Sequence, residues 1–429
     1  MRMLHTSDWH LGRTLHGVDL LEHQAAYLDH LVELARSERA DAVLVAGDVY
    51  DRAVPPVEAV RVLTEALVRL AEVTTIVLTP GNHDSAVRLG FLSPLLTGRV
   101  RLSTALAGVG TPVVLPHADG DVRVHALPYL DPDQARRDLA PAASGGSPGG
   151  DRAGEGPETV GSDVADDLPG DEDAAADARD AGPVLLARSH EAVMTAAMDR
   201  VRADLDRHPG RSVVMAHAFV VGGEPSESER DIRVGGVDSV PAGVFAGVDY
   251  VALGHLHGPQ TIRFPSHGAH EAVPVLRYSG SPLAYSFSER HHEKSTTLVD
   301  LGPAGVRSVE AVPAPVPRRV SEVVGRLEDL LAGIGAPYVG DWLRVTVTDD
   351  VRPPDLYARL RERFPHLLVL EHRPAARPAS GAALVTAARD PLEVLGEFVE
   401  YVTGAPPTPA EAAALRTAHE RVLEQDRSA

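Results

Sequence analysis

Several Asp, Asn and His residues directly follow stretches of apolar, β-branched residues, a pattern typical of buried strands. One such stretch, residues 75–79, is followed by Pro-Gly and then by Asn82, His83 and Asp84. An amide, an imidazole and a carboxylate therefore lie just beyond a strand end, where ligands bind in open α/β sheets. Taken alone, this segment is equally well explained as a polar turn with an N-cap at Asn82 or Asp84.

The same pattern recurs at four more strand ends. The residues concerned are Asp8 and His10 after residues 3–6, Asp48 after 42–46, His217 after 212–216, and His255 and His257 after 248–253. Because residues i and i+2 of an extended chain point to one side, Asp8 and His10 are expected to reach the same ion. A single Asp-x-His segment is more easily explained as a chance occurrence than as a metal site. Five strand ends that all carry such residues are not easily explained by chance. We therefore expect all these residues to meet at one edge of one sheet.

The types of these side chains indicate which ions they would bind. Mixed Asp, Asn and His ligands suit hard or borderline divalent ions such as Mn²⁺ better than a structural zinc. The chain has no cysteine, which excludes disulfides, Cys-type zinc sites and thiol catalysis. Seven candidate ligands exceed the needs of one ion. Two ions about 3.5–4 Å apart that share a carboxylate are typical of phosphatases and nucleases, so the sequence predicts two divalent ions, with Mn²⁺ as the best match.

Helical patterns lie between the predicted strands. Apolar residues recur at helical spacing over 21–35 and over 57–70, and prolines directly precede the second helix. This order of strands and helices is the βαβ signature of a largely parallel sheet. Further along, the pattern predicts strands at 113–115, 122–127, 274–278 and 296–301 and a helix over 187–206. These elements complete a first α/β domain.

Residues 141–183 are a low-complexity segment of Ala, Gly, Ser, Pro and Asp. They contain eleven acidic residues and two arginines, a net charge of −9. Such a segment cannot bury enough apolar surface to become ordered, so we expect a disordered loop inserted into the first domain. A plain solvated linker is favoured over a regulatory role.

The composition changes after residues 313–317. The later pattern predicts a helix over 321–333, a strand at 342–347, a helix over 354–364 and a strand at 366–370, which suits a small α+β domain. A Pro/Ala-rich linker then leads to helical patterns at 391–402 and 409–424. The first of these has an apolar stripe from Leu392 to Val402, which fits either the core of the small domain or a docking helix for a partner.

Length, charge and composition limit the possible classes of protein. At 429 residues, 44% of them apolar, the chain is long enough for two or three domains. The formal charge of −20 argues against a broad basic surface for nucleic acid, but not against a local or metal-centred groove. No signal-type segment and no run of about 18 apolar residues is present, so we expect a cytoplasmic protein without a membrane span. Lys294 is the only lysine, which we attribute to a coding bias toward arginine. No Gly-rich loop precedes this lysine, so the sequence predicts no ATP-binding P-loop in this chain.

Together, the strand-end residues match the signature of the calcineurin-like metallophosphoesterases. Here the signature reads Asp8-Trp9-His10, Gly47-Asp48, Gly81-Asn82-His83-Asp84, His217 and Gly254-His255-Leu256-His257. More narrowly, the chain resembles the SbcD nuclease family in residues 5–12, 47–51 and 278–289. The region after Val309 resembles the small capping domain of that family.

The resemblance implies a fold and a division of the chain. The fold is an α/β metallophosphoesterase β-sandwich flanked by helices, followed by a small α+β capping domain and C-terminal helices. The implied units are a nuclease domain at 1–305 that contains the 141–183 insertion, the capping domain at 306–375, and a linker with partner-docking helices at 376–429.

The resemblance also implies roles for the site residues. One ion would be held by Asp8, His10, Asp48 and His257, and the other by Asp48, Asn82, His217 and His255, so that Asp48 bridges them. His83 would face the scissile phosphate, stabilising the transition state or protonating the leaving oxygen, and Asp84 would orient His83. Asp51 is given no role.

The activity implied is that of a metal-dependent DNA nuclease. It would be a 3′–5′ exonuclease on duplex DNA and an endonuclease on single strands and hairpins, in repair and recombination. Its partner would be an SbcC-like ATPase, with a homodimer of this chain inside a heterotetramer. One alternative is a metallophosphoesterase for small phosphate monoesters or diesters. Another is a catalytically inactive scaffold, which would require missing ligands, and none is missing.

Overall fold

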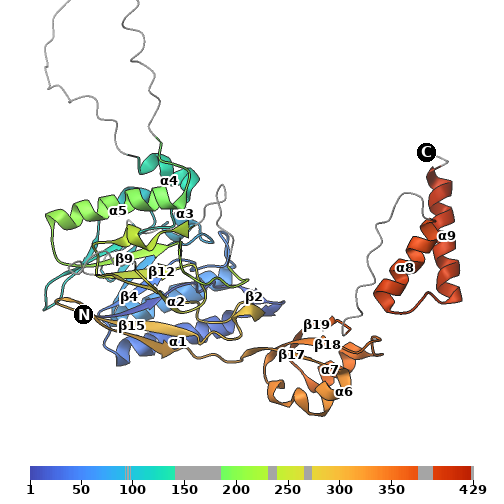
Figure 1. Ribbon diagram of the computed structural model, residues 1–429. Helices are drawn as coiled ribbons and strands as arrows, with labels where there is room; N and C mark the ends of the chain where they lie inside the picture. The colour runs from blue at the N-terminus through green and yellow to red at the C-terminus, as the bar shows by residue number, and fades with distance from the viewer. Residues whose placement is uncertain are drawn as a thin grey trace, which may run out of the picture.

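The computed structural model describes residues 1–140 except 92, 94, 95 and 97, and residues 185–229, 239–264, 273–374 and 390–426. The expected insertion at 141–183 and most of the expected linker after Arg373 lie outside these residues. The part before residue 314 is built around two six-stranded sheets (Figure 1). Their stacking, with helices on both outer faces, confirms the predicted sandwich.

The first sheet contains the strands from the beginning of the chain. Its order is β16 (Gly305–Pro313), β15 (Ser295–Gly302), β1 (Arg2–Thr6), β4 (Ala42–Ala46), β5 (Thr75–Thr79) and β6 (Val100–Leu102). β1, β4, β5 and β6 run parallel, whereas β15 is antiparallel to β1 and β16. Helices α1 (Leu21–Ser37) and α2 (Val57–Val73) connect the first parallel strands. The predicted βαβ units are therefore confirmed.

The second sheet is formed by later strands. Its order is β13 (Gln260–Ile262), β14 (Val275–Tyr278), β12 (Tyr250–Gly254), β9 (Arg211–His217), β8 (Val122–Ala126) and β7 (Val113–Leu115). The four central strands are parallel, and the two outer strands are antiparallel to their neighbours. Short elements lie between the strands of the two sheets. α3 (Ala86–Leu89) follows β5 and η2 (Leu106–Gly108) follows β6, whereas α4 (Pro132–Asp138), β10 (Phe219–Val220), β11 (Ser239–Val240) and η3 (Ala242–Phe245) lie between strands of the second sheet.

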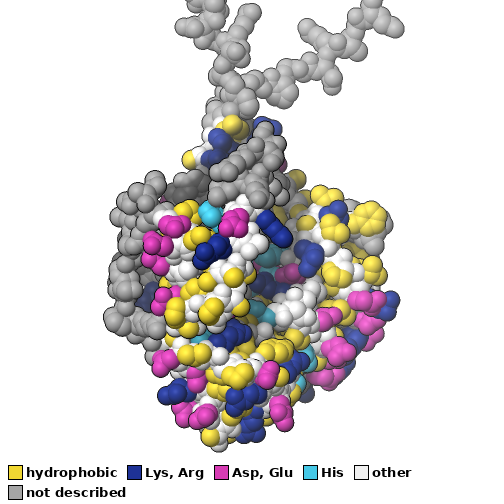
Figure 2. Space-filling view, turned by 90° about the vertical axis from the view of Figure 1, so that its right-hand side faces the viewer, with side chains coloured by type: hydrophobic (Ala, Val, Ile, Leu, Met, Phe, Trp, Pro, Cys, Tyr) yellow, Lys and Arg dark blue, Asp and Glu magenta, His cyan; other side chains and the backbone are white. Residues whose placement is uncertain are grey.

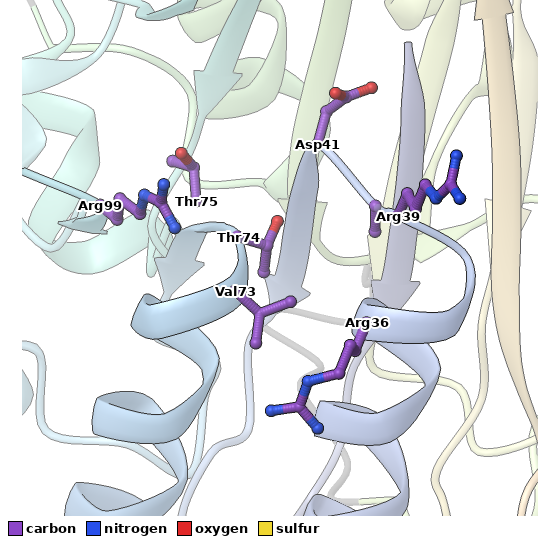
Figure 3. Close-up of a pocket in the computed structure, with 8 residues that line it drawn as sticks. Arg36, Arg39, Asp41, Val73, Thr74, Thr75 and Arg99 are labelled. Carbon is purple, nitrogen blue, oxygen red and sulfur yellow. The ribbon is translucent and has the colours of Figure 1, made fainter.

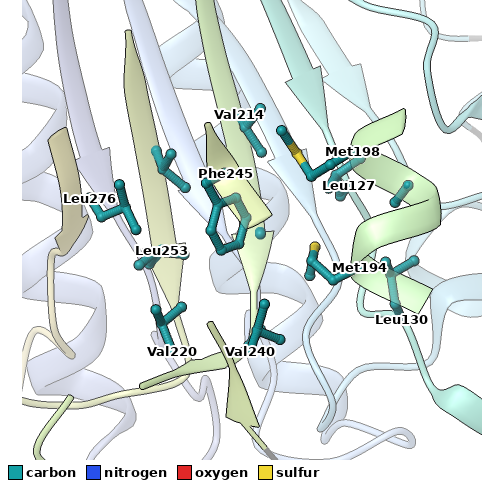
Figure 4. Close-up of a cluster of buried hydrophobic side chains, with 14 of the residues drawn as sticks. Leu127, Leu130, Met194, Met198, Val214, Val220, Val240, Phe245, Leu253 and Leu276 are labelled. Carbon is teal, nitrogen blue, oxygen red and sulfur yellow. The ribbon is translucent and has the colours of Figure 1, made fainter. Parts of the chain in front are cut away.

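Three apolar layers hold the sandwich together. Between the sheets, Leu44 and Val77 of the first pack in one cluster with Met215 and Tyr250 of the second. Side chains of α1 and α2 cover the outer face of the first sheet. On the outer face of the second sheet, Met194 and Met198 of α5 (His190–Arg207) meet Val214, Leu253 and Phe245 (Figure 4). Burial of this apolar surface is the main source of stability for such a fold.

The presence of two sheets corrects one expectation. We expected all strand-end residues to lie at one edge of one sheet. Instead, Asp8, Asp48 and Asn82 follow strands of the first sheet, whereas His217 and His255 belong to strand ends of the second. Hydrophobic runs mark strands that are buried on both faces, but they do not show which sheet a strand joins.

The small domain has a three-stranded parallel sheet ordered β17 (Val320–Gly325), β18 (Trp342–Val347) and β19 (Leu367–His372). Its helical segments are α6 (Leu327–Asp329), a π-helical turn at Leu330–Ile334, a 3₁₀ turn at Ala336–Tyr338, and α7 (Leu356–Arg363). The expected helix over 321–333 is therefore wrong in its first part, because residues 320–325 pair with β18. The hairpin of β15 and β16 also places residues 306–313 in the first sheet, so the expected boundary at 305 falls inside a paired strand.

Apolar contacts join the small domain to the sandwich. Trp342 and Val320 pack with Tyr285 and Phe287, which lie in and before η4 (Phe287–Glu289), and with Leu15 beside the β2–β3 hairpin (Thr14–Leu15, Val18–Asp19). The guanidinium of Arg344 lies 4.5 Å from the centre of the Phe287 ring. Two helices, α8 (Pro391–Thr403) and α9 (Pro409–Asp426), end the described chain. No described helix has the length and apolar character needed to cross a membrane.

Candidate metal centre

The carboxyl ends of five strands, three from the first sheet and two from the second, meet at one place. The backbone N–H of Asp8 donates to the carbonyl oxygen of Gly47 (3.0 Å), which connects the exits of β1 and β4. Across the sandwich, a Cβ atom at Gly254 would lie 1.8 Å from the carbonyl oxygen of Ala46. Only glycine allows this approach, so the site requires the two sheets to touch at their strand ends.

The backbone at these strand ends is not extended. Asp8, His10, Asp48 and His255 have φ values of 55°, 45°, 50° and 105°, in the left-handed region that non-glycine residues seldom adopt. The predicted convergence of Asp8 and His10 is found, but the expected extended geometry is wrong. Strained residues of this kind are concentrated at functional sites, where the surrounding structure holds them in place.

One group of candidate ligands consists of Asp8, His10 and His257, all buried. One ligand atom from each lies within 4.8 Å of the other two. The Nε2 atoms of His10 and His257 are 3.1 Å apart. Two imidazole nitrogens that face each other beside a buried carboxylate suit a divalent cation, because each can offer it a lone pair.

Asp48 is at the centre of the second group. Its Oδ2 atom lies 3.4 Å from Nε2 of His217, 3.5 Å from Nε2 of His10 and 4.0 Å from Nε2 of His83. The Oδ1 atom of Asn82 is 2.9 Å from the same nitrogen of His217. The His255 ring lies 5.4 Å from that of His217. All seven sequence-predicted ligands are therefore brought to one cluster, in which all but the partly buried Asn82 are buried and Asp48 is adjacent to both groups.

Burial and charge set the protonation of this cluster without ions. Burial raises the pKa of Asp8 to about 6. Burial alone would lower the pKa of His217, but its ion pair with Asp48 raises that pKa to about 9. Burial alone would raise the pKa of Asp48, but His217 and His10 hold that pKa well below its usual value. Without ions, the proton on His217 stabilises the Asp48 carboxylate, as a bound cation would. The donor set therefore fits two divalent ions.

His83 lies at the edge of the cluster, less buried than the other members. Its ring is 4.7 Å from that of His10, and its Nδ1 is 2.7 Å from the carbonyl oxygen of Asp51, which accepts a hydrogen bond from it. Asp84 was expected to orient His83, and its contacts show how it could do so. The Asp84 carboxylate accepts hydrogen bonds from the backbone N–H groups of Val49 (3.0 Å), Tyr50 (2.9 Å) and Gly81 (2.9 Å).

Asp84 therefore joins two loops, and its link to His83 is indirect. It ties the exit of β5 to the loop that carries Asp51, and so holds the carbonyl group that positions His83. Burial, together with the charge of Asp48, raises the pKa of Asp84 to about 7. Sequence reasoning left Asp51 without a role because a backbone carbonyl leaves no trace in residue type.

Sequence reasoning also missed a polar group behind His257. Ser228 Oγ lies 2.7 Å from Nδ1 of His257 and donates to the Glu289 carboxylate, which pairs with Lys294. Burial alone would raise the pKa of Glu289, but Lys294 and His257 hold it well below its usual value. The available signal was a single lysine in an arginine-rich chain, which we had attributed to coding bias.

A separate pocket of about 420 Å³ lies at the opposite, amino-terminal end of the strands (Figure 3). Arg36, Arg39 and Arg99 line it, but their guanidinium groups lie on different sides of the pocket. Arg99 donates to the carbonyl oxygens of Ala71 and Glu72 at the end of α2. Arg99 thus satisfies the end of α2, Arg36 pairs with Glu33, and none of the strand-end ligands lines this pocket.

Two family patterns match the chain. The family described as calcineurin-like phosphoesterase matches residues 1–136. The SbcD_C family, described as type 5 capsule protein repressor C-terminal domain, matches residues 316–403. The first match covers the exits of β1, β4 and β5, and the second covers the three-stranded sheet and α8.

Known proteins are similar over most of the chain. The D subunit of the SbcCD nuclease of Bacillus subtilis (strain 168) is 36% identical over 312 residues, which make up 71% of this chain and 67% of the relative. A crystal structure of TT1561 of Thermus thermophilus covers 72% of this chain and 98% of its own, but with 13% identity and a TM-score of 0.33 it supports no argument. The two family matches and the Bacillus relative agree, and the chain belongs to the SbcD family, the D subunits of SbcCD nucleases, which carry a calcineurin-like phosphoesterase domain.

Proposed function

We propose that this chain is a two-metal phosphodiesterase that cleaves DNA, as the D subunit of an SbcCD-type nuclease. One observation carries the proposal. Asp8, His10, Asp48, His217 and His257 form overlapping groups whose ligand atoms lie within 4.8 Å of one another, at the ends of strands from two sheets. The name of the Bacillus relative supports nuclease activity, and the donor set supports two divalent ions, with Mn²⁺ as the preferred metal.

The proposed division of ligands is the one that the resemblance to the family implies. Asp8, His10 and His257 hold one ion, and Asn82, His217 and His255 hold the other. Asp48 bridges them, because its carboxylate lies near His10 of one group and His217 of the other. When bound, the ions would activate the attacking nucleophile and neutralise charge on the phosphate.

His83 acts on the substrate rather than on the ions. Its Nδ1 bonds the Asp51 carbonyl, so the proton on Nδ1 is fixed and Nε2 is directed toward the cluster. From that position, the imidazole stabilises charge on the phosphate and carries the proton for the leaving oxygen. Asp84 keeps the Asp51 carbonyl in place.

The first experiment separates metal binding from cleavage. His83→Ala should retain two Mn²⁺ ions per chain and lose roughly 10²–10⁴-fold in cleavage rate, the usual range for acid–base catalysis. His117→Ala, at the other end of the strands, is the control and should keep the wild-type rate. If His83→Ala cleaves DNA at near wild-type rate with Mn²⁺, the proposed role of His83 is wrong.

DNA is proposed as the substrate in preference to a small phosphate ester. On the face in Figure 2, acidic and basic side chains are interspersed with apolar ones, and several basic side chains lie around the central hollow. Bound ions would add positive charge locally for the DNA backbone. We would assay linear duplex labelled at either end, a hairpin and a chromogenic phosphodiester, each with Mn²⁺ or Mg²⁺. Release of nucleotides from 3′ ends and hairpin opening support the nuclease. Turnover of the small ester alone would identify the alternative enzyme. DNA as substrate implies the cytoplasmic location expected from the sequence.

The proposed partner is an SbcC-like ATPase, and α8 is its proposed docking helix. No residue of α8 is buried in the described chain, and Phe398 and Tyr401 are 62% and 89% exposed. The α8 residues lie outside the core of the small domain, which favours docking over core packing. Phe398→Asp should abolish co-elution with the ATPase subunit but keep turnover of the small ester. Val351→Asp, an equally exposed apolar site, is the control.

A homodimer is proposed on a second apolar surface. Val57 on α2 and Val87 and Phe91 in and after α3 are exposed, and Arg88 of α3 donates to the carbonyl oxygen of Ala53 just before α2. A second copy of the chain would cover these side chains. Phe91→Glu should convert a dimer to a monomer in light scattering, and an unchanged mass would contradict this contact.

A further inference from the structure

Lys294 is the one lysine among 41 lysine and arginine residues, and it is only 5% exposed. A buried ammonium is unfavourable unless its charge and its N–H groups are satisfied. Its place in the fold is therefore informative. Lys294 directly precedes β15, and its side chain contacts the loop that carries the proposed ligand His257.

Three acceptors surround the Lys294 ammonium. They are the carbonyl oxygen of His257 (3.0 Å), Oγ of Ser281 (2.9 Å) and the Glu289 carboxylate. An ammonium has three N–H donors, so each donor has one acceptor. A planar guanidinium with five donors does not match this compact set. The geometry thus gives a physical reason for a lysine where the rest of the chain uses arginine.

The same network reaches the imidazole of His257. Ser228 gives its hydroxyl proton to Glu289, so its oxygen accepts the proton on Nδ1 of His257, 2.7 Å away. That tautomer leaves the lone pair of Nε2 free, on the side that faces His10. Glu289 is itself held by the backbone N–H of Tyr285 (3.0 Å) and by Lys294.

We propose that Lys294 is a positioning residue for the metal ligand His257. It holds the backbone of His257 directly and sets the ring tautomer through Glu289 and Ser228. This inference rests on the proposed function, in which His257 binds one of two ions. Groups that orient a metal-bound histidine in this way change metal affinity roughly 10–100-fold when they are removed.

The experiment measures Mn²⁺ binding, not activity, by titration of the free Mn²⁺ spin-resonance signal at a temperature where every variant is folded. In Lys294→Met, one of the two ions should bind roughly 10–100-fold more weakly while the other is retained. Lys294→Arg should not restore the lost affinity. The control is Arg211→Met, which also removes a buried cation: Arg211 donates to the carbonyl oxygen of Leu301 (3.1 Å) at the far end of β9. It should keep both wild-type affinities.

Two further variants make every outcome decisive. Glu289→Gln keeps the size of the side chain and should reproduce the loss if Lys294→Met does not fold. Wild-type affinity for both ions in Lys294→Met or Glu289→Gln overturns the inference, as does an equal loss in Arg211→Met. His257→Ala separates the two proposals: if it too binds both ions normally, the ligand assignment fails, whereas weakened binding in His257→Ala alone rejects only the role of Lys294.

Discussion

Asp48 has the most connected carboxylate in the candidate metal centre. One of its oxygens lies within 3.5 Å of His10 and His217, and its other oxygen accepts the backbone N–H of His83 (2.9 Å). Asp48→Ala should therefore remove both ions, and elemental analysis of the protein after gel filtration should find close to none per chain.

A distant acid provides the control for Asp48. Asp300→Ala removes a partly exposed carboxylate at the other end of the first sheet, opposite Arg2 and 3.8 Å from the amino group of Met1. This variant should keep two ions. Two ions still bound in Asp48→Ala would disprove the bridging role.

His5 provides a pH test away from the ions. Its Nδ1 bonds the hydroxyl of Tyr250 (2.9 Å) between the sheets, and burial, with Arg277 nearby, lowers its pKa to about 3. As pH falls below about 6.5, the unfolded chain gains a proton on His5 that the folded chain does not. Stability should therefore fall with pH, by up to about 1.4 kcal/mol for each pH unit from this residue.

The comparison variant is His5→Gln, studied by urea unfolding at pH 7, 6 and 5 with chelator present. Its free energy of unfolding should fall less steeply than that of the wild type, since all other titrating groups are shared. If the two dependences on pH are parallel, His5 is not held neutral by the fold.

At the residue scale, the sequence identified side chains better than their geometry. Asp, Asn and His were recognisable because they follow five separate apolar runs, although each occurrence alone has another explanation. The left-handed φ values of Asp8, His10 and Asp48 were not predictable, because they are imposed by contacts between distant strands. The role of the Asp51 carbonyl was not predictable either, because every residue has a backbone carbonyl and its residue type gives no sign of such a role.

At the scale of elements, the approach of β12 to β4 creates the site. The Gly254 backbone lies against the carbonyl of Ala46, and a Cβ there would be only 1.8 Å from that oxygen. Gly254→Ala must push the two sheets apart, which we expect to destabilise the protein by about 1–3 kcal/mol or more and to weaken metal binding.

Calorimetry and metal analysis would check this expectation. The matched control is Gly210→Ala just before β9, where an added Cβ meets no atom within 4 Å. Equal unfolding temperatures for the two variants would show that the sheets tolerate separation at Gly254.

Strands were predicted well where they are buried on both faces and less well elsewhere. β4, β5 and β9 are fully or nearly fully buried, and their apolar runs marked them. In β17 only Val320 and Val323, three residues apart, are buried. Val324 is 61% exposed, and its spacing with Leu327 and Leu331 imitated a helix. Pairing with β18 decided the structure there, which no local pattern records.

At the scale of the whole molecule, the acidic segment 141–183 interrupts one helical pair. On either side of it, α4 and α5 belong to one apolar cluster, and the backbone N–H of Leu186 donates to the carbonyl oxygen of Arg136 (3.1 Å). The chain therefore leaves and re-enters the domain at neighbouring points, and a short linker can replace the segment.

Replacing 141–183 by a short Gly/Ser linker should change the unfolding temperature by no more than about 2 °C and leave cleavage of a small phosphodiester unchanged. Because the segment carries a net charge of −9 out of −20, its removal should strengthen DNA binding at low salt, and the gain should disappear as salt screens the charges. A variant that keeps the length but replaces the eleven acidic residues by Ser should show the same gain, since the effect comes from charge. A large fall in the unfolding temperature of the deletion variant would instead identify the segment as part of the folded domain, and an unchanged DNA affinity would mean that the two metal ions dominate the local field at the site.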